Sequence, residues 1–190
     1  MNRAYLEKSY RHNNKLVEIY LDNIVERFNL SSEQEHAFRT VANHALSETE
    51  RLSMYLGGMG GTGKSQVIKA LMTFFEEHNE SHCFMILAPT GSAAALLNGS
   101  TYHSALGLND RVNAANAKNI AKVCSRLEGV QYIFIDEVSM ISCHDLFRIS
   151  AQLARATNGF DMPFGGINMI FAGDFAQLPP VKGGLCIVKI

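Results

Sequence analysis

The chain has 190 residues, of which 47 % are hydrophobic, and its 17 basic and 18 acidic side chains leave a formal net charge of −1. This length and apolar content are enough to bury a sizeable core, and they predict one globular domain rather than a disordered chain. The near balance of charge excludes a function that depends on a strongly basic surface as a whole, so any binding of nucleic acid has to come from local residues.

The N-terminus shows no apolar segment behind a basic one, and no apolar run approaches the length that spans a bilayer. We therefore expect an intracellular protein without a membrane partner, in the nucleus or mitochondrion of a eukaryote or in the cytoplasm otherwise. The four cysteines are too widely spaced for a paired metal or redox motif, which favours reduced thiols. They are Cys83, Cys124, Cys143 and Cys186.

The first predicted element is a helical extension over residues 1–30. Its apolar residues recur at helical spacing and predict one buried face. They are Leu16, Ile19, Tyr20, Ile24 and Phe28. A second helix is expected to begin at Ser31 or Ser32, because residues 31–35 offer overlapping capping boxes. We therefore divide the chain into the extension and a main domain over residues 31–190.

Residues 58–65 fit the phosphate-binding pattern G-x-x-x-x-G-K-[ST]. The apolar run over residues 52–56 predicts a buried strand before this loop, and the spacing of apolar residues over 66–78 predicts a helix after it. The glycines let the backbone turn tightly and direct successive N–H groups at an anion near the start of a helix. A nucleotide-binding loop is predicted, with a glycine-rich turn that holds no ligand as the alternative.

Within this loop, Lys64 is expected to reach the β- and γ-phosphates, and the hydroxyl of Ser65 is expected to ligate Mg²⁺. The backbone cradle for the nucleotide comprises Gly58, Met59, Gly60, Gly61, Thr62, Gly63, Lys64 and Ser65.

Further strands and helices alternate along the rest of the chain. Buried strands are predicted over residues 83–88, 131–135 and 168–172, and helices over residues 90–97, 110–127 and 142–156. The last helix has Leu146, Ile149 and Leu153 on its inner face. Strands that alternate with helices imply an α/β fold, in which a parallel sheet is covered by helices on both faces.

Two acidic residues, Asp136 and Glu137, follow the strand over residues 131–135. Open α/β sheets place their ligand chemistry at this carboxyl end of the strands. Asp136 could hold Mg²⁺, and Glu137 could orient and deprotonate the attacking water. A solvated pair of acids at a strand end is the alternative reading.

The next strand is followed by the run Gly-Asp-Phe-Ala-Gln-Leu-Pro-Pro-Val over residues 173–181. The amide of Gln177 could touch both the γ-phosphate and the catalytic water, and so sense the state of the nucleotide. Asp174 could instead cap a local turn, and the two prolines could simply end the strand. These two interpretations stay open on the sequence.

With these segments in place, the chain resembles a known family, the PIF-type (petite integration frequency) DNA helicases of superfamily one. The segments follow the family's order and spacing over roughly residues 30–182, and the run over residues 173–181 is the most specific of them. They are residues 58–65, 88–94, 99–104, 136–140, 163–166 and 173–181.

The resemblance implies a RecA-like domain that binds ATP and Mg²⁺ and contacts single-stranded DNA. Gln34 resembles the family's adenine-reading glutamine, although a capping role for the same side chain stays open. Two segments resemble those that bind the DNA strand, where hydroxyls and an imidazole meet phosphates or stack on bases. Their residues are Pro89, Thr90, Thr101, His103 and Ser104. His103 could instead be a core or loop histidine, and Phe164 could either stack on a base or pack against the domain.

The family couples ATP hydrolysis to translocation on single-stranded DNA and to unwinding, with roles in DNA repair, recombination and telomere maintenance. Its motors have a second RecA-like domain that supplies arginines to the transferred phosphate, and the resemblance implies that this partner is needed for hydrolysis. Because the chain ends at Ile190, we expect the first motor domain alone to hydrolyse ATP very slowly. A truncated nucleotide-binding remnant without unwinding activity is the alternative.

Overall fold

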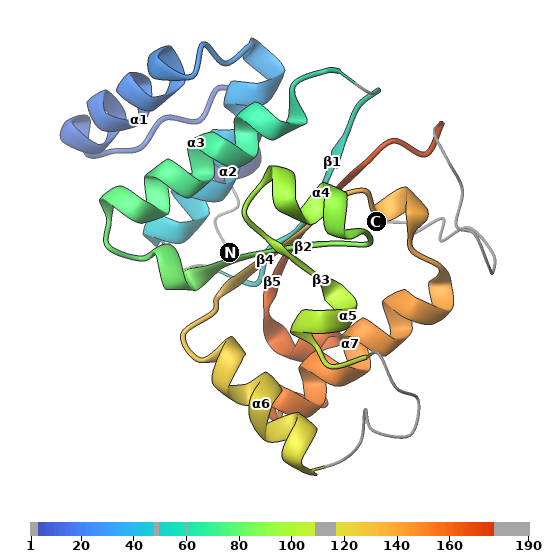
Figure 1. Cartoon of the computed structure of the whole chain (residues 1–190). Coiled ribbons are helices and arrows are strands. Elements are labelled where there is room, and N and C mark those ends of the chain that lie inside the picture. Colours follow the sequence, from blue (N-terminus) through green and yellow to red (C-terminus); the bar gives the residue numbers. More distant parts are fainter. Residues whose placement is uncertain (1–3, 48–49, 60, 109–116, 177–190) are drawn as a thin grey trace. The chain divides into compact units, whose positions relative to one another are not determined.

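A computed structural model describes residues 4–47, 50–59, 61–108 and 117–176 (Figure 1). The chain divides into two compact units. Unit 1 comprises Met1–Leu52 and Gly61–Ser81, and unit 2 comprises Ser53–Gly60 and His82–Ile190. In the described part, unit 1 is helical and unit 2 contains the sheet. The division into residues 1–30 and 31–190 stays a prediction.

Unit 1 is built from a short 3-10 helix η1 (Ala4–Leu6) and the helices α1 (Lys15–Arg27), α2 (Ser32–Ser47) and α3 (Lys64–Glu77). The predicted buried face of α1 is wrong in part. Ile24 is buried as predicted, but Leu16 and Ile19 are exposed, and Leu21 is buried in their place. Leu21 was not expected on the inner face. The helix is turned so that Glu18, which lies on the side of Leu21, meets a buried arginine of α2.

That arginine is Arg39, which is only 5 % exposed. Its guanidinium donates to Glu18 at 3.0 Å, to Glu35 at 2.7 Å, and to Asp22. Two of these carboxylates come from α1 and one from α2 itself. The cluster therefore fixes α1 on α2 through charge, which an analysis of apolar spacing does not detect.

The N-terminus of α2 confirms the predicted capping box. The backbone N–H of Ser31 donates to Oε1 of Gln34 at 2.9 Å, and the N–H of Gln34 lies 3.5 Å from Oγ of Ser31. The apolar side chains of Ala37, Phe38, Val41 and Ala42 lie on one side of α2 and are buried. Local capping and apolar spacing thus agree on where this helix begins and which face it buries.

Unit 2 contains a five-stranded sheet in the order β1-β5-β4-β2-β3, and each neighbouring pair is parallel (Figure 1). The strands are β1 (Ser53–Gly57), β2 (Phe84–Ala88), β3 (Ser100–Thr101), β4 (Tyr132–Ile135) and β5 (Asn168–Gly173). The predicted α/β fold with a parallel sheet is confirmed. The two-residue strand β3 was not predicted, because it is too short to show an apolar pattern.

The helices of unit 2 are α4 (Gly91–Leu96), α5 (Tyr102–Ala105), α6 (Ala117–Leu127) and α7 (Cys143–Thr157), with the 3-10 turns η2 (Ser81–Cys83), η3 (Val138–Met140) and η4 (Pro163–Gly166). The predicted inner face of α7 is buried as expected. The core contains fully buried side chains from the central strands and from α7 and the end of α5. Among them are Leu106, Ile133, Ile135, Ile149, Leu153 and Met169.

No helix within the described residues is both long enough and apolar enough to cross a bilayer.

Candidate functional site

The glycine loop approaches α3 through two residues in left-handed backbone conformation. Gly61 has φ 82° and Gly63 has φ 80°, a region that L side chains rarely adopt. Gly63 is the N-cap of α3 and offers no side chain to the first turn, which begins with Lys64 and Ser65. The loop therefore brings a helix N-terminus and a lysine together, as anion binding requires.

The other half of the loop belongs to unit 2, where Gly58 and Met59 follow β1 and Met59 is largely exposed. Gly60 lies outside the described residues. Within unit 2, Gly58 and Met59 thus leave a strand, and within unit 1 the loop from Gly61 leads into a helix, while the cradle as a whole stays a prediction.

Gln34 uses both ends of its amide. While Oε1 accepts from the N–H of Ser31, Nε2 donates to the carbonyl oxygen of Thr62 at 2.9 Å. A Cβ placed on Gly63 would clash with the same Nε2. The capping role is therefore present, and the amide also touches the phosphate loop. Adenine reading by Gln34 stays a prediction.

Asp136 and Glu137 stand at the carboxyl end of β4, which lies between β5 and β2. Both side chains are half-buried. The N–H of Asp136 donates to the carbonyl of Leu87 at 2.9 Å, and its Oδ1 accepts from the N–H of Glu137 at 3.0 Å. Glu137 has φ 50° and ψ 42°, an unfavourable conformation for a residue with a side chain. Strained residues of this kind cluster at functional sites.

The end of β5 packs directly against the turn that follows Glu137. A Cβ on Gly173 would lie 3.1 Å from the backbone nitrogen of Val138 and 3.2 Å from that of Ser139. The next residue, Asp174, is buried, and its Oδ1 accepts from the N–H of Ala176 at 2.9 Å. Asp174 thus caps the local turn, as the alternative reading of the sequence proposed. Gln177 lies outside the described residues.

Tyr55 of β1 is a residue that the sequence analysis missed. Its hydroxyl donates to the carbonyl of Gly173 at 3.0 Å, and its ring lies 5.4 Å from that of Phe175. Burial raises the pKa of Tyr55, and the carboxylate of Asp174 adds to this shift. The signal that could have found it is the pairing of β1 with β5, since Gly57 lies opposite Gly173 in the register.

The two segments predicted to bind DNA meet at one place in the fold. Strands β2 and β3 are paired so that Ala88 lies opposite Thr101. Residues Pro89 and Thr90 follow β2, and α5 follows β3. Oγ1 of Thr90 accepts from the N–H of Ala93 at 3.2 Å, and Oγ1 of Thr101 accepts from that of Ser104 at 3.3 Å. Both threonines therefore cap short helices at the same edge of the sheet.

His103 is half-buried, and its ring centroid lies 4.1 Å from that of Tyr102, with the planes 30° apart. Burial lowers the pKa of His103, although Asp145 opposes this shift. Burial also raises the pKa of Tyr102 to about 12, with a contribution from Asp145. His103 is therefore neutral at physiological pH, so it can stack or donate a hydrogen bond but does not add a positive charge.

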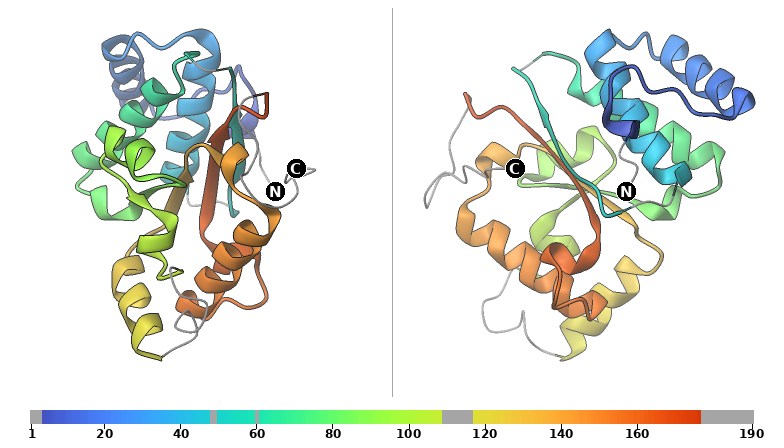
Figure 2. Two further views of the ribbon diagram at one scale, coloured as in Figure 1. Left: turned by 45° about the vertical axis from the view of Figure 1, so that its right-hand side comes forward. Right: turned by 180° about the vertical axis from the view of Figure 1, so that it is seen from behind.

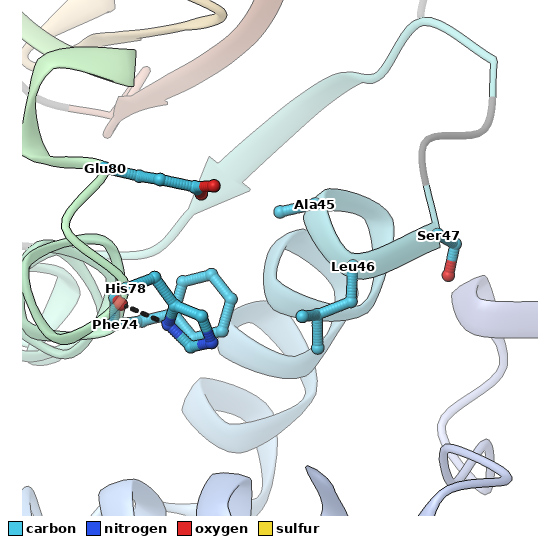
Figure 3. Close-up of a pocket in the computed structure, with 6 residues that line it drawn as sticks. All are labelled: Ala45, Leu46, Ser47, Phe74, His78 and Glu80. Atoms are coloured by element: carbon cyan, nitrogen blue, oxygen red, sulfur yellow. Dashed lines mark hydrogen bonds between the residues drawn. The ribbon is translucent and has the colours of Figure 1, made fainter.

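A cavity of about 300 Å³ in unit 1 lies near the C-terminal end of α3 (Figure 3). Phe74 and His78 line it together with residues from the end of α2. His78 is fourteen positions beyond Lys64, about 21 Å along a helix axis. This cavity is separate from the phosphate loop. Among the described residues, no group of three side chains is arranged to hold a metal ion.

Comparison with known proteins gives one family. The family model described as PIF1-like helicase matches residues 29–185. An ATP-dependent DNA helicase Pif1 of Bdellovibrio bacteriovorus is 38 % identical over 134 residues, which cover 68 % of this chain and 29 % of that protein. The helicase RRM3 of Saccharomyces cerevisiae is 32 % identical over 157 residues, covering 80 % of this chain and 21 % of that protein.

Solved structures agree with these sequence relatives. The crystal structure of the Pif1 helicase from Candida albicans has a TM-score of 0.61 at 31 % identity and covers 80 % of this chain and 34 % of that chain. The Bacteroides Pif1 helicase in complex with ADP-AlF₃ and single-stranded DNA has a TM-score of 0.60 at 28 % identity, covering 77 % and 33 %. The chain thus spans about a third or less of the relatives that it matches, and it belongs to the PIF1-like helicase family.

Proposed function

We propose that the protein acts as an ATP-dependent DNA helicase, in which this chain is the first motor domain. The observation that carries the proposal is the backbone of the phosphate loop, where left-handed Gly61 and Gly63 lead directly into a helix that begins with Lys64. Membership in a family whose named relatives are ATP-dependent DNA helicases supports it. ATP hydrolysis would drive translocation on single-stranded DNA and the separation of duplex.

In the proposed reaction, Lys64 and the loop N–H groups bind the phosphates of ATP. Ser65 and Asp136 offer hydroxyl and carboxylate oxygens, the donors that Mg²⁺ prefers, and the ion would neutralise charge on the β- and γ-phosphates. Glu137 orients the attacking water and takes its proton. Gln177 senses the γ-phosphate, and Gln34 reads the adenine from its place beside the loop.

The proposed DNA contacts are the hydroxyls and the imidazole at the edge where β2 and β3 end. Thr90, Thr101 and Ser104 lie at the N-terminal turns of two short helices, where phosphate oxygens can be bound without reading bases. Pro89 completes the first segment, and the neutral ring of His103 is suited to stacking. Contacts of this kind bind a strand without sequence preference.

A second motor domain is the proposed partner for hydrolysis. An arginine supplied by such a partner contributes a factor of about 10³ to 10⁵ in turnover. We therefore propose that residues 1–190 alone bind ATP weakly and hydrolyse it very slowly. We also propose that the protein acts inside the cell in DNA repair, recombination and telomere maintenance. Its compartment would be the nucleus or mitochondrion of a eukaryote, or the cytoplasm otherwise.

The test of the phosphate loop is Lys64→Ala. Because a hydrogen bond to a charged group contributes about 1.5–3 kcal/mol, the affinity for ATP should fall by about 10- to 100-fold, as measured by titration with a fluorescent ATP analogue. The matched control is Lys69→Ala on the exposed side of the same helix. Equal affinities for the two variants would refute the loop as the nucleotide site.

The test of the catalytic base is Glu137→Gln in the protein joined to its second motor domain. ATP turnover should fall by about 10²- to 10⁴-fold while ATP affinity is retained, since a glutamine cannot accept the proton from water. Glu128→Gln, at an exposed position after α6, is the matched control. Normal hydrolysis by Glu137→Gln would remove Glu137 from the mechanism.

A further inference from the structure

Helix α6 has an unusual charge for this chain. Its eleven residues include three basic side chains and no acidic one, whereas the whole chain has a net charge of −1. The three are Lys118, Lys122 and Arg126, and all are exposed. Because they are spaced four residues apart, they lie on one side of the helix at intervals of about 6 Å along its axis. We call these three residues the basic ridge.

The basic ridge borders α5, as two sets of hydrogen bonds show. Nη1 of Arg126 donates to the carbonyls of Ser104 at 2.7 Å and Ala105 at 3.0 Å. Near the other end of α6, Nδ2 of Asn119 donates to the carbonyl of Gly107 at 2.9 Å. The opposite side of the helix buries apolar side chains in the core. Figures 1 and 2 show α6 beside α5.

We propose that the basic ridge binds the phosphate backbone of DNA that continues past α5. This inference rests on the proposed function, in which Thr101, His103 and Ser104 contact a DNA strand. Arg126 joins the two sites, because one nitrogen of its guanidinium holds the carbonyl of Ser104 and the same group has further N–H donors. A strand leaving α5 toward the ridge then meets cationic side chains at regular intervals.

The chemistry of the ridge matches phosphates rather than bases. Lysine side chains act as flexible point charges, which neutralise phosphates without the fixed geometry that base reading needs. One carboxylate near α5 is Asp145, which accepts hydrogen bonds from Ser142 and Arg148 and is thus already neutralised in part. The ridge therefore adds affinity that is independent of sequence and sensitive to salt.

The test compares two double variants that change the net charge by the same amount. Lys118→Glu/Lys122→Glu reverses two charges of the ridge, and Lys15→Glu/Lys69→Glu reverses two exposed lysines in unit 1. DNA affinity is measured over a range of salt concentrations, with an oligothymidylate of about 16 nucleotides and with a duplex of equal length. Titration with ATP checks that each variant retains its nucleotide site.

If the ridge binds phosphates, removing two contacts lowers the slope of log affinity against log salt by about 1.4 for single-stranded DNA. Affinity falls by about tenfold near 0.15 M salt relative to the control pair. A loss of affinity for the oligothymidylate alone assigns the ridge to single-stranded DNA. A loss of affinity for the duplex alone assigns it to duplex DNA. Either result supports phosphate binding by the ridge.

Equal slopes and equal affinities for the two double variants would refute phosphate binding by the basic ridge. The proposed helicase function would not be affected by that result. If the unaltered protein binds neither probe, both the ridge and the proposed DNA contacts are wrong. The milder pair Lys118→Gln/Lys122→Gln separates these results from misfolding, because it removes the same two contacts without adding negative charge and should also lower the slope by about 1.4.

Discussion

Both units bury apolar side chains, but they differ in the part that charged groups take in holding a helix in place. In unit 1, α1 is fixed to α2 by Arg39, whose guanidinium is almost completely removed from water, and by its three carboxylates, of which Asp22 is largely exposed. In unit 2, the central strands and α7 are held by side chains such as Ile133 and Ile149 that are fully buried and apolar. The spacing of apolar residues in a sequence therefore predicts the apolar packing but not the charged contact of Arg39.

The apolar and the charged contacts also contribute to the free energy of unfolding in different ways. Apolar burial stabilises in proportion to the area removed from water and does not depend on exact partners. A buried guanidinium stabilises only while its carboxylates are present, since an unpaired buried charge is strongly unfavourable. The attachment of α1 should therefore be specific in geometry and sensitive to single changes of charge.

The largest expected effect is in the apolar core of unit 2. Phe134→Ala should lower the free energy of unfolding by about 3–5 kcal/mol, because it leaves a cavity at a fully buried position in β4. Phe147→Ala, on α7 with 71 % of its side chain exposed, is the matched control and should change stability by less than about 0.5 kcal/mol. Denaturant titration measures both, and similar losses would contradict the assignment of the core.

The second effect is in the charged cluster of unit 1. Arg39→Met replaces the guanidinium by a shorter apolar side chain and removes the donor that Glu18, Asp22 and Glu35 share, so it should cost about 3 kcal/mol. Hydrogen exchange should locate the loss in α1 and α2. Lys8→Met removes an exposed ion pair with Glu33 and should cause no measurable change. If Arg39→Met proved neutral, apolar contacts alone would hold α1.

A smaller effect tests the hydroxyl of Tyr55 in unit 2. Tyr55→Phe removes the hydrogen bond to Gly173 and should cost about 1 kcal/mol, with the ring contact to Phe175 retained. Tyr20→Phe removes a comparable hydrogen bond to Glu77 in unit 1, where the acceptor is exposed, and should cost less. Thermal denaturation of the two variants ranks them, and the reverse order would contradict the difference in burial.

The smallest effect is a dependence on pH that arises in unit 1. His44 is buried, burial lowers its pKa, and its Nε2 is hydrogen-bonded to the carbonyl of Glu50. The unfolded chain therefore binds a proton more readily than the folded one, and stability falls as the pH drops below about 6.5. Denaturant titration from pH 8 to pH 5 measures this loss, and His44→Gln should reduce it. An unchanged profile would exclude His44 as a source.

Much of the sheet and the phosphate loop followed from the sequence, because each depends on local patterns. Continuous apolar runs located β2, β4 and β5, and the glycines of the loop marked positions with positive φ. The face of α1 was wrong in part, at Leu16 and Ile19, because the contacts of Glu18 and Asp22 with Arg39 help to orient the helix. Tyr55 was missed because its partner Gly173 is 118 positions away, and no local pattern records a contact of that range.

The close packing at Gly173 has a mechanical consequence. A Cβ built on Gly173 would lie 3.1 Å from the nitrogen of Val138, closer than most real Cβ contacts, so the end of β5 has little room to move toward η3. The end of β5 and the turn after β4 are therefore in close contact. We therefore expect a displacement of Asp174 to move Val138, the residue that follows Glu137.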